Sequence, residues 1–497
     1  MTAKDGPVDE PVWIGIDVGT QSVRAQAVTA GGDVVGNGSA PLESTRAAGG
    51  RHEQDPELWW HALGVAAHRA TSGLRPELIR AAALCATSGT ILLTDDRNRA
   101  LTDALMYDDA RAETEAALVQ ETGAEIWHKL GHTMQRSWAL PKVLWLLHSG
   151  TVETRTARVA HQSDHLAGRL VGHRVAADSS HALKTGYDSV EGRWPEEVID
   201  RLEVPVSALP EVVVPGALLG RVDASGAEHT GLPEGLPVVA GMTDGCAAQI
   251  AAGALLPGDW NSVLGTTLVL KGVTEGLLRD PSGVMYSHRH PDGGWMPGGA
   301  SSVGAGALTD RFPRHDLGAL DAAAIDHEHV KGVAYPLSGK GERFPFLRPD
   351  AEAFETGVFT GKVDRYAALL HGVAYIERLC LEHVARLGAP VRTVSLTGGA
   401  TRSRYWSQIR ADVLRMPLRV PSHTEPSFGM AVLAAARDPN TPSSSVAEAA
   451  RRMVRVREVV EPRDETADLF ESGYRRMVAE LDRRGYLTPP SDERQNL

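Results

Sequence analysis

Residues 12–28 read VWIGIDVGTQSVRAQAV, and this stretch decides the class of fold. Two runs rich in β-branched residues flank Gly19-Thr20, which is typical of two strands joined by a tight turn. A further run follows the turn Gly31-Gly32. The chain is therefore predicted to open with three short strands joined by two hairpin turns: Val12–Val18, Val23–Val28 and Val34–Asn37.

Helices and strands alternate after this opening. Asp55-Pro56 offers a helix N-cap followed by a proline at the first helical position, and the apolar residues that follow keep helical spacing. Near the middle, Trp260–Leu264, Gly265-Thr266-Thr267 and Leu268–Val273 repeat the order of strand, Gly-Thr turn and strand. Two half-chains that begin alike predict an α/β fold of two duplicated domains facing each other across a cleft. We expect the hinge near Pro257-Gly258.

The later part of the chain follows the same pattern of elements. A long amphipathic helix is predicted over Val363–Leu387 and ended by Gly388, followed by a strand at Thr393–Leu396 and a glycine-rich turn. The segment 446–497 is rich in Arg and Glu with helical spacing, and its last ten residues are expected to form a loose tail.

Composition narrows the class of protein. The chain has 497 residues, of which 42% are hydrophobic and 23% charged, as in an ordinary globular protein. The net charge of −12 argues against nucleic acid or an anionic membrane as the main partner, since both favour a basic surface. An odd number of distant cysteines (Cys85, Cys246 and Cys380) predicts no disulfide framework.

Location can also be predicted from the sequence. The acidic N-terminus lacks the features of a secretory signal. The most apolar interior stretch, 246–256, is about 11 residues long, against the roughly 20 of a membrane helix. Together with the cysteine pattern, this predicts a soluble cytoplasmic protein.

Asp17, Gly19 and Thr20 form the first candidate site. The backbone amides of the glycine turn and the Thr20 hydroxyl suit phosphate oxygens, and Asp17 at the strand end suits Mg²⁺ held through water. An ordinary hairpin turn is the alternative. The second Gly-Thr turn, 265–267, favours phosphate binding, because a triphosphate gripped from both halves needs two such turns.

Asp244 forms the second candidate site. It stands between a predicted strand at Pro237–Ala240 and a helix of small residues. Phosphoryl transfer to a hydroxyl needs alignment, metal charge and a carboxylate that accepts the proton. A plain helix N-cap is the alternative interpretation.

Taken in this order, from about Val12 to about Ala436, the motifs resemble those of the FGGY carbohydrate kinases. These kinases share their fold with hexokinase, actin and the heat-shock chaperone ATPases, so the resemblance implies two ribonuclease H-like domains. It implies an N-terminal domain at 12–256 with the sugar site and catalytic base, and a nucleotide domain at 257–450. A helical extension and tail at 451–497 would complete the chain.

The resemblance also implies the roles of individual residues. Asp244 would be the catalytic base, Ser88, Gly89 and Asp109 would contact the sugar with it, and Asp17 would hold Mg²⁺ through water. Lys142-Val143-Leu144-Trp145 falls in a signature of the family. The implied ATP-binding residues are Thr20, Gln21, Arg24, Gly265, Thr266, Thr267, Gly304, Gly399, Ala400 and Ser403.

Several stretches favour one branch of the family. They look most like D-ribulokinases of the plant and cyanobacterial type, often labelled xylulose kinase-like: 86–90, 182–188, 286–289, 298–301 and 341–345. Typical xylulokinases have Met-His where this chain has Thr87-Ser88, and glycerol kinases have Arg-Glu where it has Gly89-Thr90. The expected reaction is ATP-dependent phosphorylation of D-ribulose. Xylulokinase or another sugar or polyol kinase remains the alternative, and a homodimer would fit the resemblance.

A nucleotide-gated binding protein of the actin or chaperone kind is the alternative from another class. Only about a hundred residues follow the glycine-rich turn at 397–399, and their pattern is helical. A chaperone's β-rich substrate domain would have no room there.

Overall fold

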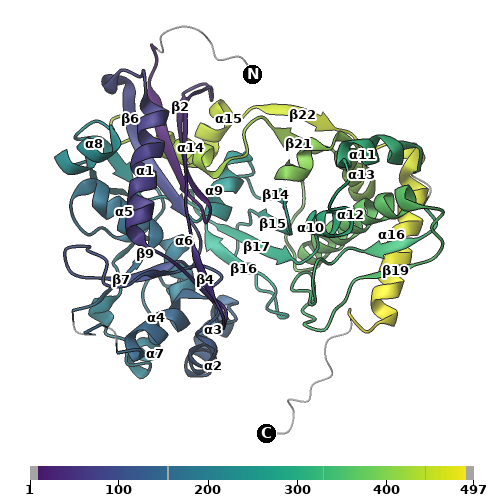
Figure 1. Ribbon diagram of the computed structural model, residues 1–497, viewed down its shortest axis with the longest axis horizontal. Helices are drawn as coiled ribbons and strands as arrows, with labels where there is room; N and C mark the ends of the chain where they lie inside the picture. The colour runs from purple at the N-terminus through teal and green to yellow at the C-terminus, as the bar shows by residue number, and fades with distance from the viewer. Residues whose placement is uncertain (1–8, 151, 154–155, 328–329, 443, 488–497) are drawn as a thin grey trace. The chain divides into compact units, whose positions relative to one another are not determined.

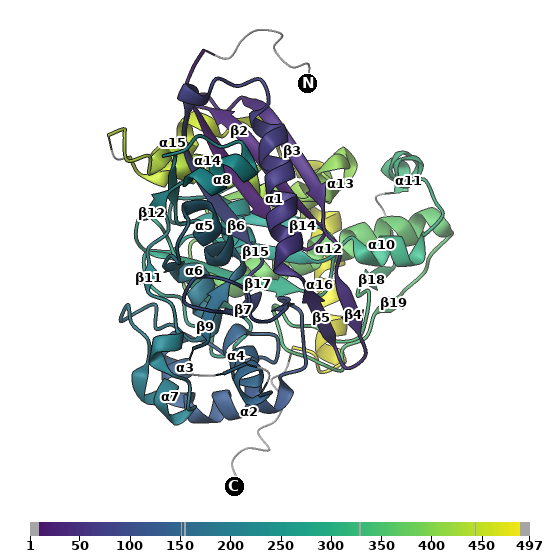
Figure 2. The same ribbon diagram turned by 60° about the vertical axis from the view of Figure 1, so that its left-hand side comes forward.

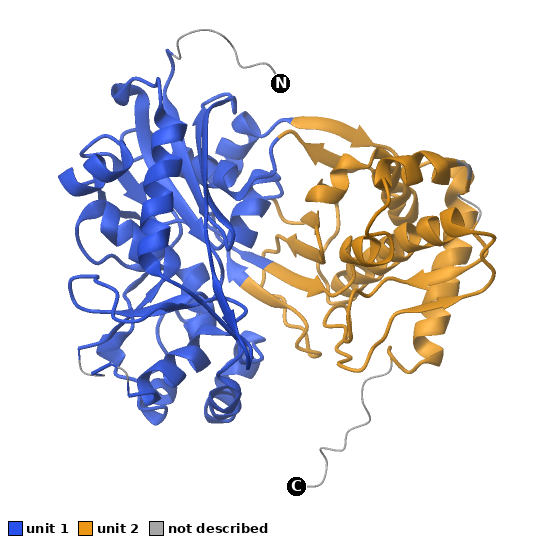
Figure 3. Ribbon diagram, in the orientation of Figure 1, with its two compact units in different colours: residues 1–255, 288–296, 423–455 blue, residues 256–287, 297–422, 456–497 orange. Residues whose placement is uncertain are grey.

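The computed structural model describes residues 9–150, 152–153, 156–327, 330–442 and 444–487 (Figure 1). The chain forms two compact units, shown in different colours in Figure 3. Unit 1 comprises residues 1–255, 288–296 and 423–455. Unit 2 comprises residues 256–287, 297–422 and 456–497.

The central sheet of unit 1 has the strand order β12-β13-β6-β1-β2-β3. Strand β1 runs antiparallel to β2 and parallel to β6, so the hairpin predicted from residues 12–28 is confirmed. Strand β13 runs parallel to β6 and antiparallel to β12. The strands are β1 (Val12–Val18), β2 (Ser22–Thr29), β3 (Val34–Pro41), β6 (Ile79–Ala86), β12 (Leu218–Arg221) and β13 (Pro237–Val239).

The sheet of unit 2 repeats this arrangement. Its order is β16-β17-β15-β14-β20-β21-β22, in which β14 is antiparallel to β15 and parallel to β20. Strand β21 is parallel to β20 and antiparallel to β22, as β13 is to β6 and β12. The predicted duplication of an α/β domain is therefore confirmed. The strands are β14 (Asp259–Leu264), β15 (Leu268–Gly272), β16 (Tyr286–Arg289), β17 (Trp295–Ser301), β20 (Thr393–Thr397), β21 (Leu418–Pro421) and β22 (Val456–Val460).

Successive side chains of β1 point to opposite faces of the sheet, which divides the core of unit 1 into two layers. Ile14 and Ile16 pack with helix α1 (Pro56–Thr71), whereas Trp13 packs with helices α9 (Asp244–Ala251) and α14 (Pro426–Ala436). Figure 2 shows α1 over the strands β2 and β3. The predicted N-cap is present, since the Asp55 carboxylate accepts a hydrogen bond from the Glu57 N–H at 2.9 Å.

Helix α14 reaches unit 1 from far along the sequence. It packs against β1, and its residues 427–436 are all buried. A Cβ on Gly15 would lie 1.7 Å from the Ser427 carbonyl oxygen, so only glycine lets helix and strand approach so closely. Unit 1 thus includes residues 423–455, most of which lie within the nucleotide domain predicted at 257–450. They belong to unit 1 because α14 covers the apolar face of β1 and β6.

The other elements fill in around these sheets. A second sheet of unit 1 has the order β4-β5-β8-β7-β9, and β10 pairs with β11. The strands are β4 (Thr45–Ala47), β5 (Arg51–Gln54), β7 (Ile91–Thr94), β8 (Ala104–Leu105), β9 (Arg158–His161), β10 (Ala177–Asp178) and β11 (Val212–Val213). The helices are α2 (Glu113–Thr122), α3 (Ala124–Leu130), α4 (Ala139–His148), α5 (Gln162–Val171), α6 (Ser179–Ala182), α7 (Glu196–Arg201), α8 (Ala224–Thr230) and α15 (Val446–Met453).

Unit 2 is built around the predicted long helix, which the structure places at Lys362–Arg386 (α12). Strand β18 pairs with β19, and the buried residues of unit 2 form one core cluster. The remaining elements are α10 (Gly306–Arg311), α11 (Leu317–Ala324), α13 (Arg404–Leu414), α16 (Ala467–Arg483), β18 (Val333–Tyr335) and β19 (Phe354–Thr356).

The region after residue 450 differs from the predicted helical extension. Residues 456–460 form strand β22, which completes the sheet of unit 2, although α15 and α16 are helical as expected. The tail predicted at 488–497 lies outside the described residues. Across the part of the chain that the structure describes, no helix has both the length and the apolar character needed to span a membrane.

Candidate active site

Asp17 and Asp244 are the acidic centre of unit 1. Asp17 lies on β1, where it pairs with Cys85 of β6 and Arg24 of β2 in the strand register. Asp244 follows β13 and is the first residue of α9, with its Oδ1 accepting a hydrogen bond from the Gly245 N–H at 2.7 Å. The carboxyl ends of the parallel strands β1, β6 and β13 share one edge of the sheet, which brings these two acids together.

The ionisation of Asp17 reflects this environment. Burial, with a further contribution from the negative charge of Asp244, raises the pKa of Asp17 to about 7. Arg24 and a hydrogen bond from the Cys85 thiol, whose Sγ lies 3.6 Å from Asp17 Oδ1, act in the opposite direction. Because Asp17 is only 7% exposed, solvent screens the repulsion between the two carboxylates weakly.

The Gly19-Thr20 turn joins β1 to β2 beside these acids. The Gly19 N–H donates to the Ser22 carbonyl oxygen at 3.1 Å, and the Thr20 carbonyl oxygen accepts from Gln54 Nε2 at 2.8 Å. The Thr20 side chain hydrogen-bonds Tyr107, and the charge of Asp244 contributes, after burial and Asp108, to a raised pKa of that phenol. Tyr107 therefore belongs to this site, although sequence reasoning gave it no role. The predicted residues Gln21 and Arg24 are exposed on the same hairpin.

A short loop at the end of β6 accepts hydrogen bonds from two lysine side chains. Lys142 Nζ donates to the Gly89 carbonyl oxygen at 2.6 Å, and Lys184 Nζ donates to the Ser88 carbonyl oxygen at 3.0 Å. Gly89 has a φ of 98°, and a Cβ there would lie 3.2 Å from Lys184 Cδ. We call residues 87–90 the β6 loop. Its backbone is held by the hydrogen bonds of these two lysine side chains.

Polar side chains complete the anchoring of the β6 loop. Thr87 donates from both its N–H and its hydroxyl to Gln162 Oε1, at 3.3 and 2.9 Å. The Ser88 hydroxyl oxygen is buried and has no hydrogen-bond partner among the described residues. A buried hydroxyl without a partner is unfavourable, so Ser88 is suited to a ligand hydroxyl.

Asp109 is fully buried, and its carboxylate is bound by other residues of the protein. It pairs with the Arg111 guanidinium at 2.7 Å and accepts from the His52 N–H, also at 2.7 Å. The neighbouring Asp108 is more exposed, and its carboxylate lies 2.5 Å from His52 Nδ1. Asp109 therefore holds the backbone after β8, and the predicted contact between Asp109 and a sugar remains a prediction.

Unit 2 carries the second Gly-Thr turn, between β14 and β15. The Ala305 N–H donates to the Gly265 carbonyl oxygen at 2.9 Å, and the Gly306 N–H donates to the Thr266 carbonyl oxygen at 3.1 Å. A Cβ on Gly304 would lie 2.3 Å from that Thr266 oxygen. The segment 304–306 thus packs against the carbonyl oxygens of the turn, whereas Thr266 itself is exposed.

The third glycine motif lies at the same end of this sheet. Thr397, the last residue of β20, pairs with Val263 of β14 in parallel register. A Cβ on Gly398 would lie 2.5 Å from the Leu264 carbonyl oxygen, so the two turns lie close together. Gly399 and Ala400 begin a 3₁₀ turn, and the Ser403 hydroxyl caps α13 by accepting from the Trp406 N–H at 3.0 Å. The structure brings the predicted nucleotide residues of unit 2 together here.

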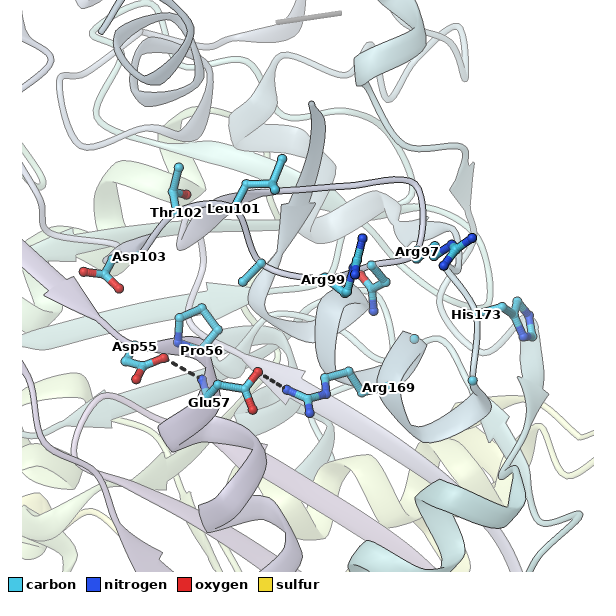
Figure 4. Close-up of a pocket in the computed structure, with 14 residues that line it drawn as sticks. Asp55, Pro56, Glu57, Arg97, Arg99, Leu101, Thr102, Asp103, Arg169 and His173 are labelled. Carbon is cyan, nitrogen blue, oxygen red and sulfur yellow. Dashed lines mark hydrogen bonds and ion pairs between the residues drawn. The ribbon is translucent and has the colours of Figure 1, made fainter. Parts of the chain in front are cut away.

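Other polar features lie apart from these residues. A polar cavity of about 700 Å³ in unit 1 is lined by residues of α1, α5 and the 97–103 loop, including Arg97, Arg169 and Asp103 (Figure 4). None of the predicted site residues lines it. Among the residues that the structure describes, no group of three or more His, Cys, Asp or Glu side chains is arranged to hold a metal ion.

Sequence reasoning did not assign roles to Lys142, Lys184 or Gln162. One signal was present for Lys142, because a lysine inside the apolar helix sequence ALPKVLWLL needs a buried partner. The partners are backbone carbonyls 36 and 53 residues away in sequence, which a sequence pattern does not show.

Two repeated sheets, each with a Gly-Thr turn after its first strand, define a two-domain α/β fold of the actin and hexokinase group. The models of the N-terminal and C-terminal domains of the FGGY carbohydrate kinases match residues 12–251 and 261–437. The chain belongs to the FGGY family of carbohydrate kinases and is a phosphotransferase that acts on a sugar.

Similar proteins agree with this assignment. Xylulose kinase of Klebsiella pneumoniae is 28% identical over 442 residues, covering 85% of this chain and 89% of that protein. Xylulose kinase of Streptomyces coelicolor is 29% identical, covering 86% of each chain. The crystal structure of xylulose kinase from Rhodospirillum rubrum superposes with a TM-score of 0.84 at 26% identity, covering 95% of this chain and 98% of that chain.

Proposed function

We propose that the protein transfers the γ-phosphate of ATP to the terminal hydroxyl of a ketopentose, giving a ketose 5-phosphate. The observation that carries the proposal is the half-buried carboxylate of Asp244 at the start of α9, beside Asp17, in an FGGY N-terminal domain. In this reaction the Asp244 carboxylate accepts the proton of the attacking hydroxyl as its oxygen bonds to phosphorus.

The acidic pair fits a magnesium ion. Repulsion between Asp17 and Asp244 contributes to the raised pKa of Asp17, and a divalent cation near Asp17 would remove that penalty. When bound, Mg²⁺ supplies positive charge to the phosphate oxygens. Asp17 would hold the ion through water, and the Gly19-Thr20 turn would offer amides and a hydroxyl to the phosphates.

We also assign a nucleotide-binding role to the turns of unit 2. Thr266 and Thr267 offer hydroxyls and amides on a turn whose backbone packs against Gly304. The neighbouring turn at Gly399 and Ala400 would receive the adenosine. Both turns stand at the carboxyl ends of parallel strands, the usual position of ligand sites in α/β sheets.

The β6 loop is the proposed determinant of the sugar. D-ribulose is our first candidate, because Thr87-Ser88 replaces the Met-His of typical xylulokinases and leaves a Ser88 hydroxyl with no partner. D-xylulose is the second candidate, because curated relatives from Klebsiella pneumoniae and Streptomyces coelicolor are xylulose kinases. Both sugars are ketopentoses with the same terminal hydroxyl.

A substrate panel tests the proposal. ADP release is measured with D-ribulose, D-xylulose, L-ribulose, L-xylulose, ribitol and glycerol at equal concentrations, with and without Mg²⁺. We expect a ketopentose to give the highest kcat/KM, and activity that depends on Mg²⁺. A first rank for glycerol would contradict the proposed substrate class.

The same assay separates the kinase from a nucleotide-gated binding protein. A kinase that closes on its sugar should hydrolyse ATP slowly in the absence of the sugar. ATP consumption that is unaffected by every added sugar would favour the binding protein instead.

A further inference from the structure

A buried polar cluster in unit 1 lies directly behind the proposed catalytic residues. Asp178 ends β10, and Ser180 and His181 lie in the short helix α6 that follows. All three side chains are almost entirely removed from solvent, with Ser180 and His181 at 0% exposure. Burial of an acid and a histidine is unfavourable unless their hydrogen bonds are satisfied, so the partners of this cluster matter.

Ser180 connects Asp178 to the segment that carries Asp244. The Ser180 hydroxyl donates to Asp178 Oδ1 at 2.6 Å. Because its one proton is used there, the oxygen accepts, and its donor is the backbone N–H of Thr243 at 2.9 Å. Thr243 is the residue before Asp244 and the N-cap of α9, and its own side chain makes no capping hydrogen bond. Ser180 therefore fixes the peptide from which α9 and Asp244 begin.

His181 connects the same acid to the β6 loop. Its Nδ1 lies 2.5 Å from Asp178 Oδ2, and its Nε2 lies 3.3 Å from the Ala86 carbonyl oxygen. Both ring nitrogens face acceptors, as in a protonated imidazole. Burial opposes that charge, but the Asp178 carboxylate, the charge of Asp164 and the Ala86 carbonyl together raise the pKa of His181. Ala86 precedes the β6 loop directly.

The two connections meet at one point in the sheet. Ala86 and Thr243 form an isolated parallel β-bridge, so one acid holds both sides of that bridge through two different side chains. The β6 loop follows Ala86, and Asp244 follows Thr243. Movement of either the Ala86 segment or the Thr243 segment would change the distance between Asp244, the proposed base, and the β6 loop.

We propose that Ser180, together with Asp178 and His181, is a positioning unit that sets Asp244 against the β6 loop for phosphoryl transfer. This inference rests on the proposed function, in which Asp244 is the base and the β6 loop contacts the sugar. Ser180 bonds the backbone N–H of the residue before Asp244, so its effect is on alignment. Misplacement of a reacting group by about 1 Å can lower the rate about 100-fold, which gives a hydroxyl at this position a large effect on kcat.

Ser180→Ala tests the unit, and Ser179→Ala is its matched control. Ser179 is the neighbouring residue in α6 and is 7% exposed, but its buried hydroxyl has no hydrogen-bond partner among the described residues. Each substitution removes one buried hydroxyl from the same helical turn. Only Ser180→Ala removes the acceptor of the Thr243 N–H.

Two readouts are measured on the full chain. For the best ketopentose, we expect Ser180→Ala to lower kcat about 10- to 100-fold with KM for both substrates within about threefold of wild type. Hydrogen exchange should be faster at the Thr243 amide in Ser180→Ala. Ser179→Ala should match wild type in both measurements. Ser180→Cys, which is slightly larger and weakens the acceptor, should give an intermediate kcat and serves if Ser180→Ala does not fold.

The outcomes separate this inference from the proposed function. Folded Ser180→Ala with wild-type kcat would overturn the positioning role, as would an unchanged Thr243 exchange rate. A wild-type protein that phosphorylates no ketopentose would overturn the proposed function instead. In that case the exchange of Thr243 would still report whether Ser180 holds this segment.

Discussion

Lys142 Nζ lies 2.6 Å from the carbonyl oxygen of Gly89 and 2.8 Å from that of Met106, with the whole lysine side chain removed from solvent. One side chain of α4 thereby ties the β6 loop to the backbone after β8. Burial lowers the pKa of Lys142 to about 7, helped by the positive charge of Lys184, so the amine can serve as a neutral donor of two hydrogen bonds.

Replacing Lys142 by Met should destabilise the fold. Methionine has a similar length but no donor, so two buried carbonyl oxygens lose their partner. We expect a loss of about 2–5 kcal/mol in the free energy of unfolding, measured by urea denaturation, and a raised KM for the sugar. Lys340→Met is the control, because Lys340 lies at the surface and pairs with the exposed Glu352. Equal urea midpoints for the two variants would show that the buried contacts of Lys142 contribute nothing.

The lowered pKa of Lys142 predicts a pH dependence of stability. The unfolded lysine keeps its ordinary pKa of 10.5, so between pH 7 and 10.5 the unfolded state binds one more proton than the folded state. Stability due to this group therefore rises with pH through that window. Below pH 7 the cost of burying the ammonium is present in full.

Comparison of wild type with Lys142→Met isolates this group. The urea midpoint of the wild type should rise more between pH 7 and pH 9 than that of the variant. Parallel pH profiles would mean that Lys142 stays protonated in the folded protein.

Asp244→Asn should separate chemistry from binding. The amide keeps the size of the side chain but accepts no proton, so kcat should fall about 10²- to 10⁴-fold while the affinity for ATP stays near that of wild type. Nucleotide affinity is measured by calorimetry. Asp200→Asn, at an exposed position on α7, controls for the loss of one charge in the same unit. Full turnover by the Asp244 variant would remove this residue from the mechanism.

Gly304→Ala should weaken ATP binding through the turn at Thr266. The added Cβ would lie 2.3 Å from the Thr266 carbonyl oxygen, so the turn must move. We expect a higher KM for ATP with a smaller change in KM for the sugar. Gly276→Ala is the control in unit 2, because a Cβ at Gly276 meets no atom within 4 Å. If both variants bind ATP equally well, the 265–267 turn has no role in holding the nucleotide.

The strands next to the glycine turns were predictable from the sequence, because the signals for them lie close together along the chain. The strands at 12–18 and 22–29 and the repeat at 259–272 carry their pattern and their turn residues within one short stretch. Strand β22 was missed, because the sequence VREVV is flanked by Arg and Glu at helical spacing. Its pairing with β21, about 40 residues earlier, decides its conformation.

The chemistry at the sheet edge was predictable only in part. Asp17 lies near the end of β1, Thr20 lies in the turn after that strand, and Asp244 follows β13, so the topology brings them together once the sheet order is given. The side chains that hold the neighbouring backbone segments in place come from elsewhere in the chain. Gln162 bonds Thr87 across 75 residues, and Ser180 bonds Thr243 across 63. Contacts at such separations leave no periodic signal in a single sequence.

The route of α14 into unit 1 has a consequence for synthesis on the ribosome. The first 255 residues emerge with the Gly15 face of β1 uncovered, and its covering helix begins at Pro426. At about 5–20 residues per second, the interval is roughly 10–30 s. During that time an apolar sheet face is open to other nascent chains. Fragments that stop short of residue 436 should therefore aggregate, and slower growth at low temperature with a chaperone that shields such surfaces should favour the full-length product.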